Sequence, residues 1–302
     1  MPSLLRIRRP VLPRRRDLGV SAVRRLDECL NEAAIRLAAT GIEAPRREAR
    51  LLMGHWLGRD PATLLGVQAE LVSALGPYFD LVARRARHEP LSHLVGRREF
   101  WSLSFEVSNQ VLDPRPDSEV LVESVLKIFT QKTGALSLLD LGTGSGCLIL
   151  SVLHERSEAT GIGVDVSGAA LEIANRNARN LSLSSRVAFV RGEWGAALSG
   201  SFDAILANPP YIPTSHIMGL APDVVDFDPH LALDGGMDGL DCFRALAEDT
   251  RRLLAPGGKA FFEIGDGQEG AVAEILQVAA LNVVDQIADL AGCTRCLIAQ
   301  AH

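Results

Sequence analysis

The sequence predicts an α/β protein in which a doubly wound, mostly parallel seven-stranded sheet follows a small all-helical domain. Short apolar runs alternate with helical stretches from Leu136 onward, which is typical of a parallel sheet covered by helices. Residues 21–88 instead carry apolar side chains at helical spacing. The last two expected strands are separated only by residues 289–294. So short a connector predicts that these two strands pair antiparallel.

The N-terminal part of the chain divides into a basic tail and a helical domain. The first 16 residues contain six arginines and no acid, so we expect residues 1–20 to form a disordered tail or, alternatively, a mitochondrial presequence. The helical pattern begins at Ser21, Gly41 can end the first helix, and Pro45 opens a second. The domain over 21–88 carries no cofactor motif and is either a substrate-docking module or a packing element. We favour docking, because the sheet does not need this domain for its core.

Residues 89–117 form a connector that we expect to contain a β-hairpin. Apolar residues alternate with polar ones in its second half, which predicts a half-buried strand; the apolar positions are Trp101, Leu103, Phe105 and Val107. After it, Pro114 and Pro116 predict an extended turn before a helix from Ser118 to Thr130. Asp117 or Ser118 is expected to cap that helix.

The α/β domain over 118–302 is predicted element by element from its apolar runs. Strands are expected at 136–140, 161–165, 186–191, 202–207, 259–264, 282–288 and 295–300. Helices are expected near 146–154, 168–179, 239–254 and 268–280.

A glycine-rich loop follows the first of these strands. It consists of Gly142, Thr143, Gly144, Ser145 and Gly146. Glycines let a backbone approach a ligand closely, but the spacing is not that of the dinucleotide fingerprint and the P-loop lysine is absent. Asp165 ends the next strand, where an acidic residue about 20 residues beyond the loop can bind a ribose diol. Because no basic cluster is present to hold phosphates, this combination favours S-adenosylmethionine over NAD.

A second motif follows the apolar run 202–207 and consists of Asn208, Pro209, Pro210 and Tyr211. The prolines end the strand and begin a rigid turn. The Asn208 side-chain oxygen and the Pro209 carbonyl can accept the two hydrogens of a planar NH2 group, and Tyr211 can cover its flat face. Holding both hydrogens directs the nitrogen lone pair at an electrophile and stabilises the charge that develops on nitrogen. Together with the glycine loop, the motif predicts a methyltransferase.

Composition narrows the class of protein. The net charge is −6, whereas a general nucleic-acid binder is more often basic. The five cysteines are scattered, which is consistent with a reducing cytosol, and no apolar stretch reaches the ~18 residues that span a membrane. We interpret Cys293 and Cys296 as strand thiols and expect no metal site, because the seven histidines lack an H-E-x-x-H pair. We expect a cytoplasmic monomer without a membrane partner or direct nucleic-acid binding.

The chain resembles the HemK/PrmC family, the glutamine-N(5) methyltransferases that act on peptide chain release factors. The resemblance covers roughly residues 20–300 and rests on Glu89-Pro90, 96–100, 114–119, 140–146, 208–213 and 232–240. It implies a small helical domain followed by a class I S-adenosylmethionine-dependent methyltransferase domain. Ser118 stands where the family commonly has Thr, and Asp113 stands where an apolar residue is usual.

The resemblance also implies the reaction and the roles of individual residues. A methyl group would pass from S-adenosylmethionine to the side-chain amide nitrogen of the Gly-Gly-Gln glutamine in class 1 release factors. The glycine loop would line the cofactor site, Asp165 would take the ribose hydroxyls, and Trp194 would pack on the adenine. Asn208 would touch both cofactor and substrate, and 208–211 would hold the glutamine amide. Without the resemblance, Trp194 is better interpreted as a core aromatic, and Arg115 as either a substrate or an ion-pair residue.

Three alternatives use the same residues differently. An adenine-N6 methyltransferase would apply the 208–211 turn to a flipped base, but the acidic net charge and residues 114–119 disfavour it. A methyltransferase for a ribosomal-protein glutamine shares the turn, and residues 114–119 argue against it less firmly. A non-catalytic binding protein would not need an intact glycine loop, Asp165 and Asn208.

Overall fold

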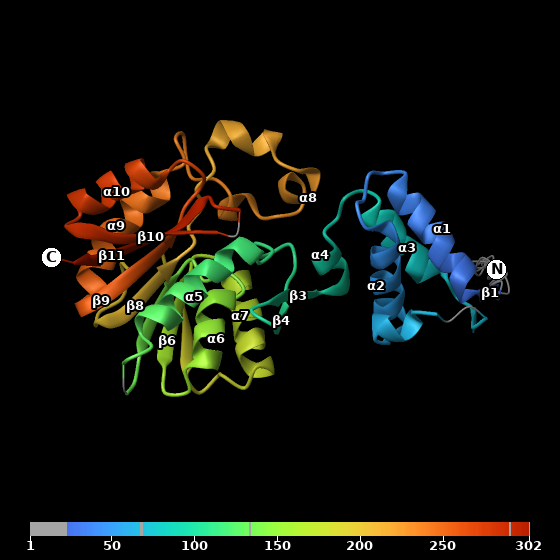
Figure 1. Ribbon diagram of the computed structural model, residues 1–302, viewed down its shortest axis with the longest axis horizontal. Coiled ribbons are helices and arrows are strands. Elements are labelled where there is room, and N and C mark those ends of the chain that lie inside the picture. The colour runs from blue at the N-terminus through green and yellow to red at the C-terminus, as the bar shows by residue number, and fades with distance from the viewer. Residues whose placement is uncertain (1–22, 67–68, 133, 290, 302) are drawn as a thin grey trace, which may run out of the picture. The chain divides into compact units, whose positions relative to one another are not determined.

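The computed structural model describes residues 23–66, 69–132, 134–289 and 291–301. The basic tail expected over residues 1–20 lies outside this part of the chain. The described residues form two compact units, one ending at Arg87 and one beginning at His88 (Figure 1).

The first unit consists mainly of helices, as the apolar spacing predicts. They are α1 (Leu26–Ala38), α2 (Pro45–Leu57), the 3-10 turn η1 (Pro61–Leu64) and α3 (Gly76–Arg85). Leu37, Met53 and Tyr78 are fully buried between them. The prediction of a helix from Ser21 is wrong in its first turn, because Val23 is exposed and residues 24–25 form a strand. This strand, β1 (Arg24–Arg25), pairs antiparallel with β2 (Leu71–Val72), so the unit is not entirely helical.

The second unit opens with the expected hairpin. Helix α4 (Leu91–Val95) leads into β3 (Arg97–Phe100) and β4 (Leu103–Glu106), which pair antiparallel. Trp101 lies in the turn rather than in the predicted strand, with φ of 52° at Trp101 and 56° at Ser102. Two consecutive positive φ angles give the turn the twist that tight hairpins favour. The prediction placed Phe105 and Val107 on the buried face, and both are buried.

A seven-stranded sheet forms the centre of this unit, in the order β10-β11-β9-β8-β5-β6-β7. Its strands are β5 (Ser137–Leu141), β6 (Thr160–Asp165), β7 (Val187–Arg191), β8 (Phe202–Ala207), β9 (Leu254–Glu263), β10 (Leu281–Ala288) and β11 (Thr294–Ala301). The five strands from β5 to β9 run parallel, and β11 is antiparallel to both of its neighbours. The predicted antiparallel pairing of the last two strands is confirmed. Strand order reverses between β5 and β8, where open α/β sheets bind ligands.

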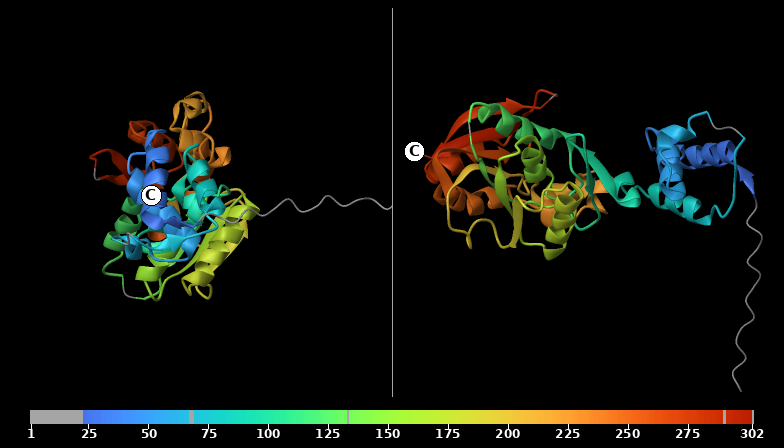
Figure 2. Two further views of the ribbon diagram at one scale, coloured as in Figure 1. Left: turned by 90° about the vertical axis from the view of Figure 1, so that its right-hand side faces the viewer. Right: turned by 90° about the horizontal axis from the view of Figure 1, so that it is seen from below.

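Helices cover both faces of the sheet (Figures 1 and 2). One face carries α5 (Glu119–Ile128), α6 (Cys147–Glu155) and α7 (Gly168–Asn180), and the other α9 (Asp241–Leu253) and α10 (Glu269–Val278). Successive strand residues alternate between the two cores: Leu138 packs with α6, whereas Leu139 packs with α9. Both faces of these strands are therefore apolar, as buried parallel strands require.

Two sequence predictions at element boundaries are wrong. Strand β9 begins at Leu254 rather than 259, with a register irregularity beside β8. Neither Asp117 nor Ser118 caps α5: the 3-10 turn η2 (Pro116–Ser118) precedes it, and the Ser118 side chain makes no capping hydrogen bond.

The segment between β8 and α9 is built from short turns of helix. They are η3 (Thr214–Gly219), α8 (Pro222–Val225) and η4 (His230–Ala232).

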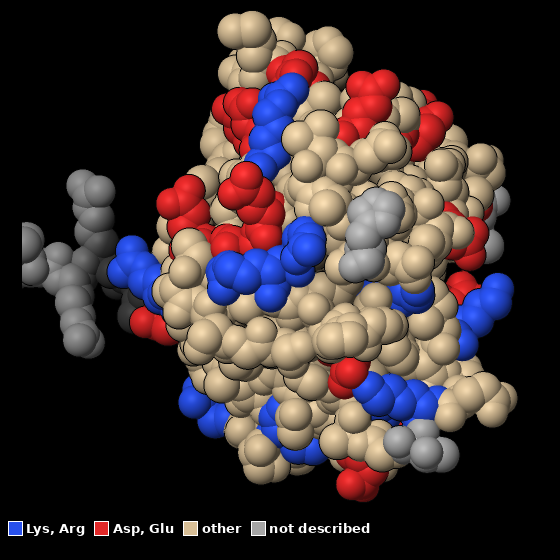
Figure 3. All heavy atoms as spheres, turned by 90° about the vertical axis from the view of Figure 1, so that its left-hand side faces the viewer, with Lys and Arg blue, Asp and Glu red and all other residues tan. Residues whose placement is uncertain are grey.

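On the face of the molecule shown in Figure 3, acidic and basic side chains are interspersed. Within the described part of the chain, no helix is both long and apolar enough to cross a bilayer.

Candidate active site

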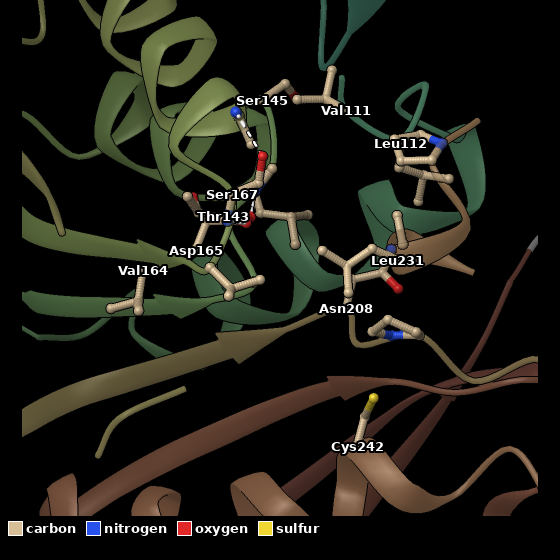
Figure 4. A pocket seen from close by; sticks show the side chains of 18 of the residues that line it. Val111, Leu112, Thr143, Ser145, Val164, Asp165, Ser167, Asn208, Leu231 and Cys242 are labelled. Carbon is tan, nitrogen blue, oxygen red and sulfur yellow. Dashed lines mark hydrogen bonds between the residues drawn. The ribbon is translucent and has the colours of Figure 1, made fainter. Parts of the chain in front are cut away.

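A cavity of about 510 Å³ opens at the carboxyl ends of the parallel strands, beside the point where strand order reverses. It brings together most of the residues that the sequence singled out: Gly142, Thr143, Gly144, Ser145, Asp165, Trp194, Asn208 and Pro210. Gly146, Pro209 and Tyr211 are not among its lining residues. Figure 4 shows Thr143, Asp165 and Ser167 on one side of the cavity and Asn208 and Leu231 on another.

The glycine loop turns sharply where β5 ends. The backbone N–H groups of Gly142 and Thr143 both donate to the carbonyl of Val164, at 2.9 Å. Gly146 has φ of +80°, which a residue with a side chain rarely adopts, and it precedes α6. The loop therefore presents backbone rather than side chains to much of this wall.

The buried carboxyl group of Asp140 supports the glycine loop through a hydrogen bond. Asp140 is fully buried in β5 and accepts a hydrogen bond from Thr143 Oγ1 at 2.6 Å. Burial raises the pKa of Asp140 to about 7, and the Thr143 hydroxyl partly opposes that rise. Asp140 Oδ1 has no hydrogen-bond partner among the described residues.

Asp165 is held rigidly at the end of β6. Its Oδ2 accepts from the backbone N–H of Gly144 at 2.9 Å, and its Oδ1 accepts from that of Ser167 at 2.8 Å. Burial raises the pKa of Asp165, while these backbone donors lower it. Each carboxylate oxygen retains further acceptor capacity, so the side chain can receive hydroxyl hydrogens from a ligand in the cavity.

Trp194 is both a core aromatic and a residue of the cavity wall, the two interpretations that the sequence allowed. It is half-buried, packs against the core cluster beneath α9, and also lines the cavity. Its backbone φ is +46°, in the left-handed region that is uncommon for such a residue. A side chain on Gly142 would lie 3.5 Å from the indole ring, so the ring lies against the glycine loop and can contact a flat ligand bound there.

Asn208 follows β8 directly, and its side-chain amide is oriented by a residue far away in sequence. Its Nδ2 donates to Ser118 Oγ at 3.1 Å. Ser118 is buried, lies at the start of α5 and also lines the cavity. With Nδ2 engaged by Ser118, Oδ1 is the part of the Asn208 amide that can accept hydrogen bonds from a substrate.

The turn after Asn208 is fixed from two directions. The Gln268 side chain donates to the Tyr211 carbonyl at 3.0 Å, and the backbone of Ile212 bonds that of Leu233 and Gly235. The Tyr211 ring packs on the core, with its hydroxyl 3.4 Å from Glu263 Oε1. The expected position of Tyr211 over the flat face of a substrate amide therefore stays a prediction.

Arg115 lines the cavity and forms an ion pair with Asp228. Its Nη2 lies 2.7 Å from Asp228 Oδ2. Burial raises the pKa of Asp228 to about 6, which Arg115 opposes. Leu231, in the next turn of chain, lines the cavity, so this ion pair joins the connector to the wall that faces the glycine loop.

Comparison with known proteins places the chain in a family. The PrmC N-terminal domain model matches residues 28–96, and the methyltransferase small domain model matches residues 101–221. The release factor glutamine methyltransferase of Rhodospirillum rubrum is 45% identical over 91% of this chain and 85% of its own length. Those of Caulobacter vibrioides and Cereibacter sphaeroides are 44% and 41% identical, over 84% and 91% of this chain and 89% and 98% of theirs. The chain belongs to the release factor glutamine methyltransferase family.

Solved structures agree on the fold. A methyltransferase from Pyrococcus furiosus superposes with a TM-score of 0.50 at 22% identity, covering 72% of this chain and 97% of its own. The catalytic domain of human Mettl16, bound to an RNA hairpin, gives 0.54 at 16% identity, covering 74% of this chain and 81% of its own. At sequence identities this low, the comparison supports an inference about the fold alone. The predicted class I methyltransferase fold is confirmed by these neighbours together with the strand order.

The residues present suit the S-adenosylmethionine that this methyltransferase family uses. The glycine loop supplies close backbone, Asp165 supplies a carboxylate, and Trp194 supplies an aromatic face. These groups match a nucleoside that carries no phosphate. Among the described residues, no group of three or more metal-binding side chains gathers.

Several residues that shape the site were missed at the level of sequence. Ser118 and Glu263 flank the Asn208 turn, and Gln268 holds it. Buried Asn177 accepts from the N–H of Glu106 at 2.6 Å and donates to the carbonyl of Ser145 at 2.9 Å, which ties the hairpin to the glycine loop. An acidic residue at the end of an apolar strand was the available signal for Glu263. Ser118 lies in the 114–119 motif but was expected only to cap a helix, and no sequence pattern indicated Gln268 or Asn177.

Proposed function

We propose that this chain transfers a methyl group from S-adenosylmethionine to the side-chain amide nitrogen of the Gly-Gly-Gln glutamine in class 1 peptide chain release factors. The observation that carries the proposal is the Asn208 amide at the end of β8, oriented by Ser118 and lining the cavity opposite the glycine loop. Close relatives bearing the name release factor glutamine methyltransferase support the choice of substrate.

On the donor side, the cavity holds the cofactor through its backbone and one carboxylate. The loop from Gly142 to Gly146 lies along the cofactor, and Asp165 accepts hydrogen bonds from the ribose hydroxyls. Trp194 packs on the adenine. When bound, S-adenosylmethionine supplies an electrophilic methyl carbon on a positively charged sulfur.

On the acceptor side, Asn208 and Pro209 make a weak nucleophile reactive. An amide nitrogen is a poor nucleophile because its lone pair is delocalised into the carbonyl. Asn208 Oδ1 and the Pro209 carbonyl each accept one N–H hydrogen, which directs the lone pair at the methyl carbon and stabilises the positive charge that develops on nitrogen. The nitrogen–carbon bond forms as the carbon–sulfur bond breaks toward sulfur, and the nitrogen gives up one proton to solvent.

The other predicted residues complete the substrate site. Pro210 lines the cavity beside Asn208, and Tyr211 covers the flat face of the amide once the substrate peptide enters. The unit ending at Arg87, which includes most of the match to the PrmC N-terminal domain, docks the release factor. The enzyme works as a cytoplasmic monomer on this protein substrate.

The test measures methyl transfer from labelled S-adenosylmethionine to four acceptors. They are a class 1 release factor, the same factor with its Gly-Gly-Gln glutamine changed to alanine, a ribosomal-protein fraction, and DNA. Label on the intact factor alone is expected. Label on ribosomal protein or DNA instead would overturn the substrate assignment while keeping the fold and the Asn208 chemistry. Asn208→Ala serves as the catalytically impaired control.

A further inference from the structure

Arg115 is the only basic residue that lines the cavity in the described part of the chain. The other charged lining residues are all acids, namely Asp165, Glu193, Asp234 and Asp241. The Arg115 side chain is 36% exposed, so part of it is open to a ligand in the cavity. Because a guanidinium group only donates hydrogen bonds, this position suits a ligand group that only accepts them.

Arg115 belongs to the same side of the cavity as Asn208. The Ser118 N–H donates to the Arg115 carbonyl at 3.1 Å, and the Ser118 hydroxyl accepts from Asn208 Nδ2 at 3.1 Å. Asp228, the ion-pair partner of Arg115, lies three residues before Leu231, which Figure 4 shows beside Asn208. Both the backbone and the ion-pair partner of Arg115 are therefore connected to the part of the wall that is proposed to hold the substrate amide.

The guanidinium group of Arg115 is fixed at one nitrogen and free at the others. Its Nη2 donates to Asp228 Oδ2 at 2.7 Å, and the Asp228 side chain is fully buried. Within the described part of the chain, Nε and Nη1 of Arg115 make no hydrogen bond. The backbone before Arg115 is held as well, since Arg98 Nε donates to the Pro114 carbonyl at 3.0 Å. Such pre-organised donors lose little conformational freedom when a ligand binds.

The Asp228 carboxylate offsets the charge of Arg115. In the proposed function, the cavity takes a methyl donor with a positively charged sulfur, and positive charge develops on the substrate nitrogen. An unpaired guanidinium group nearby would oppose both. The ion pair carries no net charge, so Arg115 can offer hydrogen bonds in this cavity without that repulsion.

The free donors of Arg115 suit the main chain of the acceptor peptide. The two glycines of a Gly-Gly-Gln segment have no side chains, so their backbone carbonyl oxygens are the groups by which a protein can hold them. These oxygens only accept hydrogen bonds, as a guanidinium group requires. The side-chain carbonyl of the glutamine is a poorer target, because a cation there would draw electron density from the nitrogen that must attack.

We propose that Arg115 is a substrate-binding residue that donates hydrogen bonds to main-chain carbonyl oxygens of the Gly-Gly-Gln segment, while Asp228 holds its guanidinium group in place. The inference rests on the function proposed above and names one group that recognises the substrate. The carboxylate of the cofactor is the other acceptor that a cation in this cavity can bind. The connection of Arg115 to Asn208 through Ser118 favours the peptide.

The kinetic test begins with Arg115→Met, which keeps an unbranched apolar stem and removes the donors. The KM for release factor should rise about 10- to 100-fold, the usual effect of losing hydrogen bonds from a charged group. The kcat should stay within about threefold, because main-chain binding is the same in the ground state and the transition state. Assays are run at about pH 8, since burial raises the pKa of Asp228 to about 6 and its carboxyl group is then ionised.

A double variant separates substrate binding from a structural role of the ion pair. Arg115→Met alone leaves the buried Asp228 carboxylate without its partner, which destabilises the fold. Arg115→Met combined with Asp228→Asn removes both charges, so the midpoint of urea unfolding should return toward that of the unaltered enzyme. The KM should nevertheless stay raised about 10- to 100-fold. A KM that recovers together with stability would show that Arg115 serves only as the partner of Asp228, and would overturn the proposal.

Lys132→Met is the matched control. Lys132 is 32% exposed and pairs with Asp203 at 2.5 Å, near the start of β8 and so at the opposite end of that strand from Asn208. This variant loses a partly exposed ion pair of the same kind, but it should leave the KM for release factor within about twofold. An equal rise in KM for Lys132→Met and the double variant would contradict a specific role for Arg115.

Calorimetry identifies which acceptor Arg115 binds. The double variant should bind S-adenosylmethionine within about twofold of the unaltered enzyme, and should bind release factor about 10- to 100-fold more weakly when saturated with S-adenosylhomocysteine. Weakened cofactor binding with unchanged release factor binding would assign Arg115 to the cofactor carboxylate and overturn the proposal. If the unaltered enzyme does not methylate release factor, the proposed function itself fails. If it does and the variants keep a normal KM, the role of Arg115 fails alone.

Discussion

The two sides of the cavity are built in different ways. The donor side consists of the glycine loop and Asp165, which are held mainly by backbone hydrogen bonds between neighbouring strands. The acceptor side consists of Asn208 and Ser118, which are joined by a side-chain hydrogen bond between residues that lie far apart in the chain. The donor side is therefore a property of the sheet and its loops. The acceptor side exists only once distant elements have packed together.

Because of this difference, substitutions on the two sides of the cavity should affect different steps, cofactor binding on one side and methyl transfer on the other. In the proposed function, backbone groups hold the methyl donor in a geometry that single side-chain changes disturb little. The acceptor side relies on one amide in one orientation, so a single substitution can remove it. Changes on the acceptor side should lower kcat, whereas changes on the donor side should weaken cofactor binding or stability.

The largest expected effect comes from Asn208→Ala. Removing the acceptor of one substrate N–H should lower kcat about 100- to 1,000-fold, the range seen when a group that stabilises transition-state charge is deleted. Some binding of S-adenosylmethionine should remain, because the glycine loop and Asp165 are untouched. Single-turnover transfer and calorimetric titration measure the two effects. Asn180→Ala, on an exposed residue at the end of α7, is the control, and near-normal turnover by Asn208→Ala would defeat the role of Asn208.

A smaller effect is expected on the donor side from Gly146→Ala. The residue has φ of +80°, and an added Cβ would lie 3.0 Å from Leu150 Cδ1. The strain should reduce the free energy of unfolding by about 1–3 kcal/mol and weaken cofactor binding. Urea unfolding and titration with S-adenosylmethionine measure this. Gly270→Ala in α10, where an added Cβ meets nothing within 4 Å, should do neither; equal behaviour of the two variants would contradict a strained loop.

The smallest effect is the pH dependence contributed by Asp140. Its folded-state pKa of about 7 exceeds the unfolded value of about 4. The folded state therefore binds the proton more tightly, and this group makes the free energy of unfolding decrease as pH rises from about 4 to about 7. Asp140→Asn has no carboxyl group to ionise and should therefore flatten that decrease. Unfolding curves across this pH range check the slope, with Asp266→Asn, an exposed loop residue, as the control that should leave it unchanged.

The same contrast explains what the sequence could predict. Contiguous sequence patterns predict the sheet, its helices and the glycine loop, because apolar alternation and strand-end motifs are local. Ser118 illustrates the limit. Its position before a helix predicted a cap, but its hydroxyl bonds Asn208, 90 residues away. Only the packing of α5 onto this face of the sheet brings these groups together, and no local pattern encodes that.

The turn between β3 and β4 was missed for a related reason. The Trp101–Ser102 turn has positive φ angles without a glycine, so its residues resembled a strand. The Trp101 N–H donates to Glu119 at 2.8 Å and its Nε1 to Glu155 at 2.9 Å. These long-range bonds offset a conformation that local preference disfavours.

The position of β11 has a consequence for the order of assembly during synthesis. Residues 294–301 follow every other strand in the chain, yet they insert between β9 and β10. A nascent chain that stops before them leaves the edge of β9 unpaired, and open edges of this kind recruit other chains. Glu263 lies on that edge, paired with Cys296. A chain truncated before residue 294 should therefore expose an unpaired strand edge at Glu263, whose carboxyl lies 3.4 Å from the Tyr211 hydroxyl in the complete sheet.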